Sequence, residues 1–148
     1  MLNESQVEEA VRMTFEEMAF LDVVAGTDPM TSLLQEGPWL FLAYTRPKSG
    51  SFALFLPKAT RYAVAEAIYG EDRGEVTSTQ LDDSLLELMN VLVGRLLTRR
   101  FGVGTAYSMG LPTVLFDFPG DIPGFSRKVF PFHNDENEMI LIWYEVPA

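Results

Sequence analysis

The chain has 148 residues, 47% of them hydrophobic and 22% charged, a balance typical of one folded domain with a buried core. Its net charge of −10 opposes binding to nucleic-acid phosphates or to an anionic membrane surface. The absence of cysteine excludes disulfides, thiolate nucleophiles and cysteine-based zinc sites. The acidic N-terminus lacks the apolar stretch of a secretory signal, and no apolar run approaches the roughly 20 residues of a membrane span. We therefore expect a cytoplasmic protein.

The first part of the chain predicts a helix followed by a β-hairpin. A capping-box pattern at Ser5 and Glu8 predicts a helix from Ser5 to Phe20. Two strands, Trp39–Thr45 and Ser51–Leu56, flank a loop with the length and residue types of a hairpin turn. Because both strands are almost continuously apolar, we expect them to be covered on both faces or to lie at the centre of a sheet.

Two helices and a group of strands follow. Lys58–Tyr69 is the second predicted helix, and Ser78–Phe101 is the third and longest, with a capping box predicted at Thr79 and Asp82. Strands are expected over Thr105–Leu111, Thr113–Phe118, Gly124–Phe132 and Glu138–Val146. No linker divides the chain. This order favours the α/β class of the α+β type, with two or three helices on one face of a single, mostly antiparallel sheet.

Several polar and aromatic residues have simple structural explanations. His133, the only histidine, falls in a predicted turn among acidic residues and lacks the spacing of a metal site. Asp82 and Asp83 diverge by about 100° on a helix, so they do not form a paired-carboxylate site. Trp143 and the other strand aromatics are typical of core packing. The apolar run Met139–Tyr144 also suggests a sheet edge that pairs with another molecule.

The longest helix carries one polar arrangement with a clear pattern. At about 100° per residue, Asp83, Glu87 and Asn90 fall within about 60° of one another, and Gly94 continues the same line. The opposite side of the helix carries Leu81, Leu85, Leu88, Leu92 and Leu96. A solvated helix face is one explanation of the polar row. Asparagine is a poor helix former, however, and its amide can both donate to and accept from a water molecule, which favours a functional role for Asn90.

The spacing Asp83-x3-Glu87-x2-Asn90-x21-Pro112 resembles the signature of the CheC/CheX/FliY chemotaxis phosphatases, and is closest to the single-motif CheX type. The resemblance implies a CheC-like fold and one phosphatase domain over residues 1–148. It also implies dephosphorylation of the phospho-aspartate of a CheY-like response regulator. Asn90 would orient the attacking water and Glu87 would pair with the lysine of the receiver domain. Asp83, Gly94 and Pro112 would support the site.

The same resemblance has consequences for cofactors, copy number and assembly. The enzyme would need no cofactor of its own, because the Mg²⁺ ion belongs to the receiver. No asparagine lies three residues after a glutamate in the predicted helix Ser5–Phe20, so we expect one site per chain. Some CheX-like proteins form homodimers, and we expect one here. Two alternatives stay open at this point: a non-catalytic receiver-binding or motor-switch-like module, and an α/β domain with an unrelated ligand.

Overall fold

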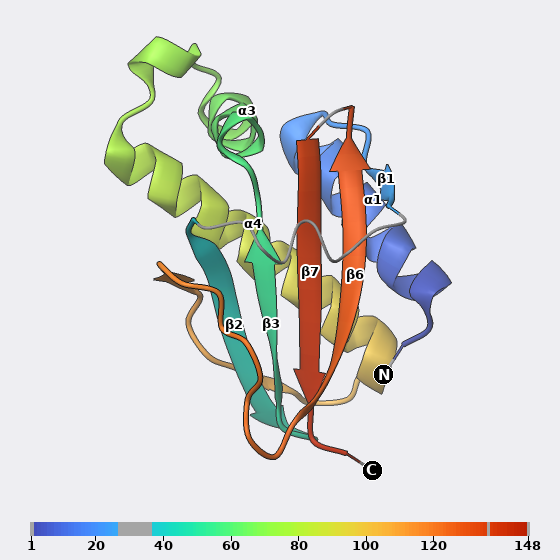
Figure 1. The fold of residues 1–148 in the computed structure, drawn as a ribbon. Coiled ribbons are helices and arrows are strands. Elements are labelled where there is room, and N and C mark those ends of the chain that lie inside the picture. The colour runs from blue at the N-terminus through green and yellow to red at the C-terminus, as the bar shows by residue number, and fades with distance from the viewer. Residues whose placement is uncertain (1, 27–36, 136, 148) are drawn as a thin grey trace.

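The computed structural model describes residues 2–26, 37–135 and 137–147. Within those residues three α-helices lie on one face of a seven-stranded sheet (Figure 1). In chain order the elements are α1 (Glu4–Ala19), β1 (Val24–Ala25), β2 (Trp39–Arg46), β3 (Gly50–Phe55), α3 (Lys58–Tyr69), a 3₁₀ turn (Arg73–Glu75), α4 (Ser78–Phe101), β4 (Ser108–Met109), β5 (Thr113–Leu115), β6 (Ser126–Asn134) and β7 (Asn137–Glu145). The predicted class and the placement of the helices are therefore confirmed.

The sheet is built from two long hairpins that meet at its centre. The strand order is β1-β6-β7-β3-β2-β4, and β5 also pairs with β2 beside β4. All of these pairings are antiparallel. Strand β3, which the sequence predicts to be central or covered on both faces, lies between β7 and β2, and all its residues are buried.

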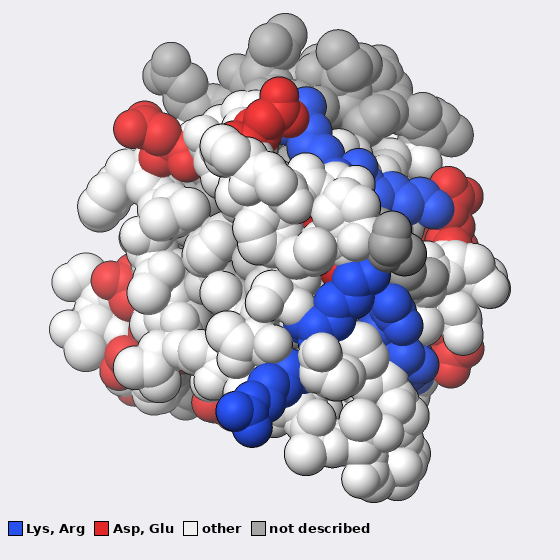
Figure 2. All heavy atoms as spheres, turned by 90° about the horizontal axis from the view of Figure 1, so that it is seen from below, with Lys and Arg blue, Asp and Glu red and all other residues white. Residues whose placement is uncertain are grey.

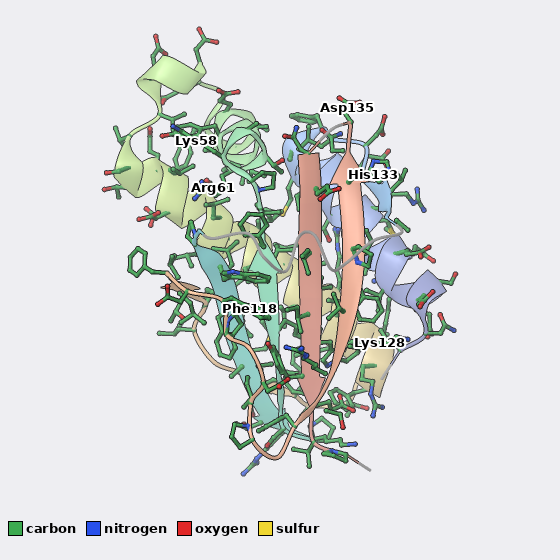
Figure 3. The ribbon with its side chains drawn as sticks, in the orientation of Figure 1. Lys58, Arg61, Phe118, Lys128, His133 and Asp135 are labelled. Atoms are coloured by element: carbon green, nitrogen blue, oxygen red, sulfur yellow. The ribbon has the colours of Figure 1, made fainter. Side chains whose placement is uncertain are left out.

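Both faces of the central strands are covered, but by different parts of the chain. The helices cover one face over a core that includes Leu42, Leu88 and Leu92. On the opposite face, Phe118 and its neighbours from the connection after β5 pack over Trp39 (Figure 3). The ring centroids of Trp39 and Phe118 are 5.3 Å apart. This second layer explains why β3 and β7 are apolar at successive positions.

The strands beside β2 are shorter than the sequence predicts. Only Ser108–Met109 of the expected 105–111 strand and only Thr113–Leu115 of the expected 113–118 strand pair with β2. The pairing between β2 and β4 shifts register, and between the two short strands the Gly110 amide donates to the carbonyl of Ala43 (2.7 Å). After β5 the chain leaves the edge to cover the second face of the sheet.

Four further sequence expectations need correction. Strand β7 lies between β6 and β3, so the apolar run around Trp143 is not a sheet edge. His133 is a half-buried residue of β6 that pairs with Glu138, whereas the turn itself contains Asp135 with a positive φ of 51°. The two N-terminal helix caps are formed by other residues than predicted: Asn3 with Gln6 in α1, and Thr77 with Gln80 in α4. Each cap lies two residues before the predicted one because overlapping patterns satisfy the same rule.

Helix α4 holds the helical layer together. It crosses the face of the sheet diagonally, and its N-terminal half extends past β2 (Figure 1). Its leucine side is buried as predicted, apart from the half-buried Leu81. At its C-terminal end Phe101 approaches Tyr44 of β2, with ring centroids 6.0 Å apart. Since α4 and β2 begin at the same end of the molecule, the two elements run in the same general direction.

Candidate active site

Asp83, Glu87 and Asn90 lie on the outer face of α4, where the helical period places them. All three side chains are exposed. Among the residues that the structure describes, none of the three forms a hydrogen bond or an ion pair. The row therefore presents two carboxylates and one amide whose polar atoms are available to a partner or to water.

The polar row is closed at its C-terminal end by Tyr107. Beyond Asn90 the same side of α4 carries Gly94, Thr98 and Phe101, and all three are half-buried. The Thr98 hydroxyl donates to the carbonyl of Gly94 (2.9 Å) and lies 3.5 Å from the Tyr107 hydroxyl. The exposed stripe of the helix thus ends one turn after Asn90.

Gly94 has no side chain, which leaves space on the surface of α4 where the Tyr107 hydroxyl lies. A Cβ atom added at Gly94 would lie 3.9 Å from the Tyr107 hydroxyl, which is an ordinary van der Waals contact. An alanine therefore fits, whereas a longer side chain would have to displace the tyrosine or extend toward Asn90. Gly94, predicted to support the site, therefore leaves the space that the Tyr107 side chain and the row beside it occupy.

Pro112 lies directly before β5, on the sheet edge next to β2. The β5 register pairs Thr113 with Phe41, so Pro112 lies next to the position of Leu42 on the helix-covered side of the sheet edge. The chain from Tyr107 to β5 runs antiparallel to β2 and thus back along α4. Counted from Tyr107, which lies beside Thr98, the four extended residues to Leu111 cover about 13 Å, or roughly nine residues of helix. Leu111 and Pro112 are therefore expected level with the part of α4 between Glu87 and Asn90.

A buried polar network fixes the other end of α4 to the sheet. The Glu145 side chain of β7 is only 3% exposed and accepts hydrogen bonds from the Tyr44 hydroxyl (2.7 Å) and from Nη2 of Arg100 (3.0 Å). The indole N–H of Trp143 donates to the Tyr44 oxygen (2.9 Å), and Nζ of Lys48 lies 3.5 Å from Glu145. The network therefore joins α4, both central hairpins and the β2–β3 turn.

The ionisation of this network follows from its burial and its hydrogen bonds. Burial raises the pKa of Glu145, but the hydrogen bonds from Tyr44 and Arg100 and the charge of Arg100 outweigh it, so the pKa lies below its ordinary value. Burial also raises the pKa of Tyr44 well above its usual range. Glu145 is therefore a carboxylate and Tyr44 a neutral donor at neutral pH. At Gly50 an added Cβ would lie 2.1 Å from the Tyr44 hydroxyl, so only glycine leaves room for this arrangement.

Ion pairs to α1 complete the support of α4. Arg95 pairs with Glu17 and also donates to the buried hydroxyl of Thr14 (3.1 Å). Arg99 lies 3.4 Å from Glu9. Because these glutamates are more than half exposed, each pair contributes about 1 kcal/mol or less. Their main effect is to fix the rotation of α4, and with it the direction of the polar row.

Basic side chains gather at one end of the molecule, away from the row on α4. Figure 2 shows Lys and Arg side chains gathered at the end where the β2–β3 turn and the C-terminal end of α4 lie. Residues at this end include Arg46, Lys48, Arg100, Arg127 and Lys128. The acidic row lies on the other half of α4, toward the opposite end. A cationic group on a partner is therefore attracted to Asp83 and Glu87 rather than to the basic end.

In the described residues the side chains of the row are exposed on the surface of α4. A cavity of about 310 Å³ lies between α1 and the β1–β6 edge, where Glu4 and Glu8 line it, but none of its lining residues belongs to α4. In the described part of the chain no three His, Cys, Asp or Glu side chains are grouped to hold a metal ion. The same residues contain no helix long and apolar enough to cross a membrane. An exposed helix face of this kind suits a macromolecular partner better than an enclosed small molecule.

Tyr107 and the Glu145 network were not found from the sequence. Tyr107 lies in the segment 105–111, which the sequence pattern predicts to be a strand. No local pattern predicts that it contacts α4. Glu145 ends an apolar strand, and the last-turn position of Arg100 is explained by the helix dipole alone. The contacts of Glu145 join residues 45 and 101 positions apart, beyond the range of local patterns. Tyr107 contacts Thr98, nine positions earlier, across the end of the helix.

Fold and surface together define a class of protein: an α+β domain that presents a carboxylate–carboxylate–amide row on one long helix. The family model described as "Chemotaxis phosphatase CheX" matches residues 41–132, more than half of the chain. The chain therefore belongs to the CheX family. The matched region includes Asp83, Glu87, Asn90 and Pro112.

Solved structures support the fold. A CheX chemotaxis protein from Desulfovibrio desulfuricans has a TM-score of 0.75 at 16% identity, over 95% of this chain and 97% of that one. CheX from Vibrio vulnificus gives 0.72 at 15% identity, over 98% and 99% of the two chains. A CheX from Borrelia burgdorferi, solved in a complex with CheY, BeF3 and Mg²⁺, gives 0.70 at 12% identity, over 97% of each chain. No curated protein matches this chain closely enough to count as a relative.

Proposed function

We propose that the chain is a phosphatase that removes the phosphoryl group from the phospho-aspartate of a CheY-like response regulator. Water attacks phosphorus, the acyl phosphate bond breaks, and the products are inorganic phosphate and the free aspartate of the receiver. Such reactions require little covalent chemistry from the protein, so positioning the water in line can supply much of the rate.

Asn90 is assigned to the water molecule. Its exposed amide has no partner among the described residues, so its oxygen can accept a hydrogen bond from the attacking water while its NH₂ group donates to a phosphoryl oxygen. Because α4 is held by its buried leucines and by the Glu145 network, the amide is presented from a rigid element.

Glu87 is assigned to docking, through an ion pair with the active-site lysine of the receiver. It is exposed, unpaired within the described chain and about one turn before Asn90 on the same face. Asp83 extends the negative row and supports the contact, while Gly94 and Pro112 shape its margins. The Mg²⁺ ion is proposed to belong to the receiver, and this chain is proposed to need no cofactor. The single observation that carries the proposal is that Glu87 and Asn90 are exposed on one helix face, without partners in the described chain, in a member of the CheX family.

The test follows the loss of phosphoryl group from a phosphorylated receiver, with and without the protein. The wild-type chain should hasten the loss at substoichiometric concentration. Glu87→Gln should weaken binding of the receiver and slow the reaction. Asp82→Asn is the matched control, because Asp82 is exposed on α4 but points about 100° away from Asp83. If wild type leaves the decay rate unchanged, the phosphatase assignment is wrong.

The main alternative is a non-catalytic receiver-binding or motor-switch-like module of the same fold. In that case the protein would bind the phosphorylated receiver without hastening its decay, and could even protect it. The free amide of Asn90 favours the enzyme, because binding alone gives no reason for a poor helix former at this exposed mid-helix position.

We also propose that the protein forms a homodimer, as the family resemblance implies. Strand β1 pairs only with Phe132 and His133 of β6, so in the described residues the outer edge of Ser126–Phe130 has no neighbouring strand. An edge of this kind can pair with another copy. Sedimentation equilibrium should give twice the monomer mass; a monomer at high micromolar concentration contradicts this part of the proposal. A cytoplasmic location stays a prediction from the sequence.

A further inference from the structure

We propose that Leu111 and Phe116 form an apolar contact surface that the phosphorylated receiver covers when it docks on α4. This inference rests on the proposed function. Leu111 is 86% exposed and Phe116 is 81% exposed, so two large apolar side chains lie in solvent within six residues of each other. Other highly exposed apolar residues, such as Phe20 and Val103, directly follow the ends of helices. Leu111 and Phe116 instead bracket β5 at the edge of the sheet.

The two residues lie along the same side of the molecule as the polar row. The β5 register and the extended path from Tyr107 place Leu111 level with the part of α4 between Glu87 and Asn90. Phe116 follows Leu115, whose partner Trp39 is the first residue of β2. The start of β2 and the N-terminal half of α4 lie at the same end of the molecule (Figure 1). The apolar pair therefore borders the row on its sheet-edge side.

The polar row and the apolar pair are close enough in size to lie within one protein interface. The polar row from Asp83 to Asn90 spans about 10 Å of helix, and Leu111 to Phe116 spans about 16 Å of extended chain. A patch of about 800 Å² on each partner, the usual size of a specific interface, can include both. A protein that brings a lysine to Glu87 and a phosphoryl group to Asn90 will then also reach Leu111.

Charge identifies the receiver, and not a second copy of this chain, as the occupant. Two copies joined through this surface about a two-fold axis would bring their rows of Asp83 and Glu87 together, and like charges at an interface oppose binding. A receiver that presents a lysine supplies the opposite charge. The apolar pair then supplies affinity, whereas Asn90 acts on the reaction.

The test separates affinity from chemistry. Leu111→Ser and Phe116→Ser are assayed for dephosphorylation of the receiver over a range of receiver concentrations. Each should raise KM about tenfold and leave kcat within about twofold, because the lost contact is equal in the bound state and the transition state. Phe20→Ser is the control: it removes an equally exposed apolar side chain from the end of α1 and should leave KM unchanged.

A second measurement makes the result independent of turnover. Binding of the receiver carrying BeF₃⁻, a stable mimic of the phosphoryl group, should weaken about tenfold in both variants. If wild type binds without catalysis and the variants bind more weakly, the contact surface stands and the phosphatase proposal fails. Unchanged KM and unchanged binding in both variants overturn the contact surface. So does a loss of self-association without a loss of receiver binding, because the occupant is then a second copy.

Discussion

Replacing Glu145 by Gln tests whether the buried network holds α4 in place. The substitution keeps the shape of the side chain but removes the charge that Arg100 and Lys48 share. It also leaves the Tyr44 hydroxyl and Nη2 of Arg100 facing an amide, which can accept from only one of them through its oxygen. The change removes stabilising interactions from a side chain that is only 3% exposed.

The expected size follows from the contacts. A hydrogen bond to a charged group contributes about 1.5–3 kcal/mol, and Arg100 is partly solvated, so the variant should lose about 2–3 kcal/mol of unfolding free energy. For a chain of this length that corresponds to a fall in Tm of roughly 5–10 °C.

The pH dependence of the effect has a definite sign. The pKa of Glu145 is depressed in the folded protein, so its contribution is complete above the unfolded-state value of about 4.5 and is lost as the pH falls through the folded-state pKa. The stability gap between wild type and Glu145→Gln should therefore be full at pH 7 and shrink below about pH 4.5.

Urea unfolding at pH 7 and at pH 3.5, followed by circular dichroism, measures both quantities. Glu16→Gln is the control, because Glu16 is exposed on α1 and its neutralisation should change stability by less than about 0.5 kcal/mol. Equal midpoints for Glu145→Gln and wild type at pH 7 would refute the anchoring role. A gap that widens on acidification would refute the sign of the pKa shift.

Three further predictions concern α4 itself. Gly94→Ala should retain activity, whereas Gly94→Leu should displace Tyr107 or cover the polar row and reduce phosphatase activity more than tenfold, with the helical circular dichroism signal unchanged. Asp83→Asn should raise KM for the phosphorylated receiver about two- to fivefold at low salt while Asp82→Asn does not, and an equal effect of both would assign the result to general charge. Leu88→Ala, at a fully buried position, should lower the unfolding free energy by about 2–5 kcal/mol in urea titrations, and a loss below 1 kcal/mol would contradict the core placement.

Local patterns were sufficient for the helices and for the exposed row. The bounds of α3 and α4 follow from apolar periodicity, from Pro57 before one helix and from the glycines after both. The same period places Asp83, Glu87 and Asn90 on one face, and the structure leaves that face exposed. The roles of these residues in catalysis stay predictions, because exposure alone does not show a reaction.

What the sequence could not supply depends on distant contacts. The apolar run around Trp143 is equally compatible with an edge strand and a central strand, and only the pairing of β7 with both β6 and β3 decides between them. Tyr107 and Glu145 gain their neighbours from α4 and β2 through tertiary packing. The short β4 and β5 are limited by a register shift and by a chain that leaves to cover the second face, which no local propensity records.

The most direct test of the central claim is the single-turnover rate with Asn90→Ala at saturating concentration. The variant should bind the BeF₃⁻-activated receiver within about threefold of wild type, because the docking contacts of Glu87 remain. Its rate of phosphoryl loss should fall to that of the receiver alone. A variant that binds normally and dephosphorylates the receiver at the wild-type rate would show that Asn90 does not position the attacking water, and would contradict the proposed mechanism.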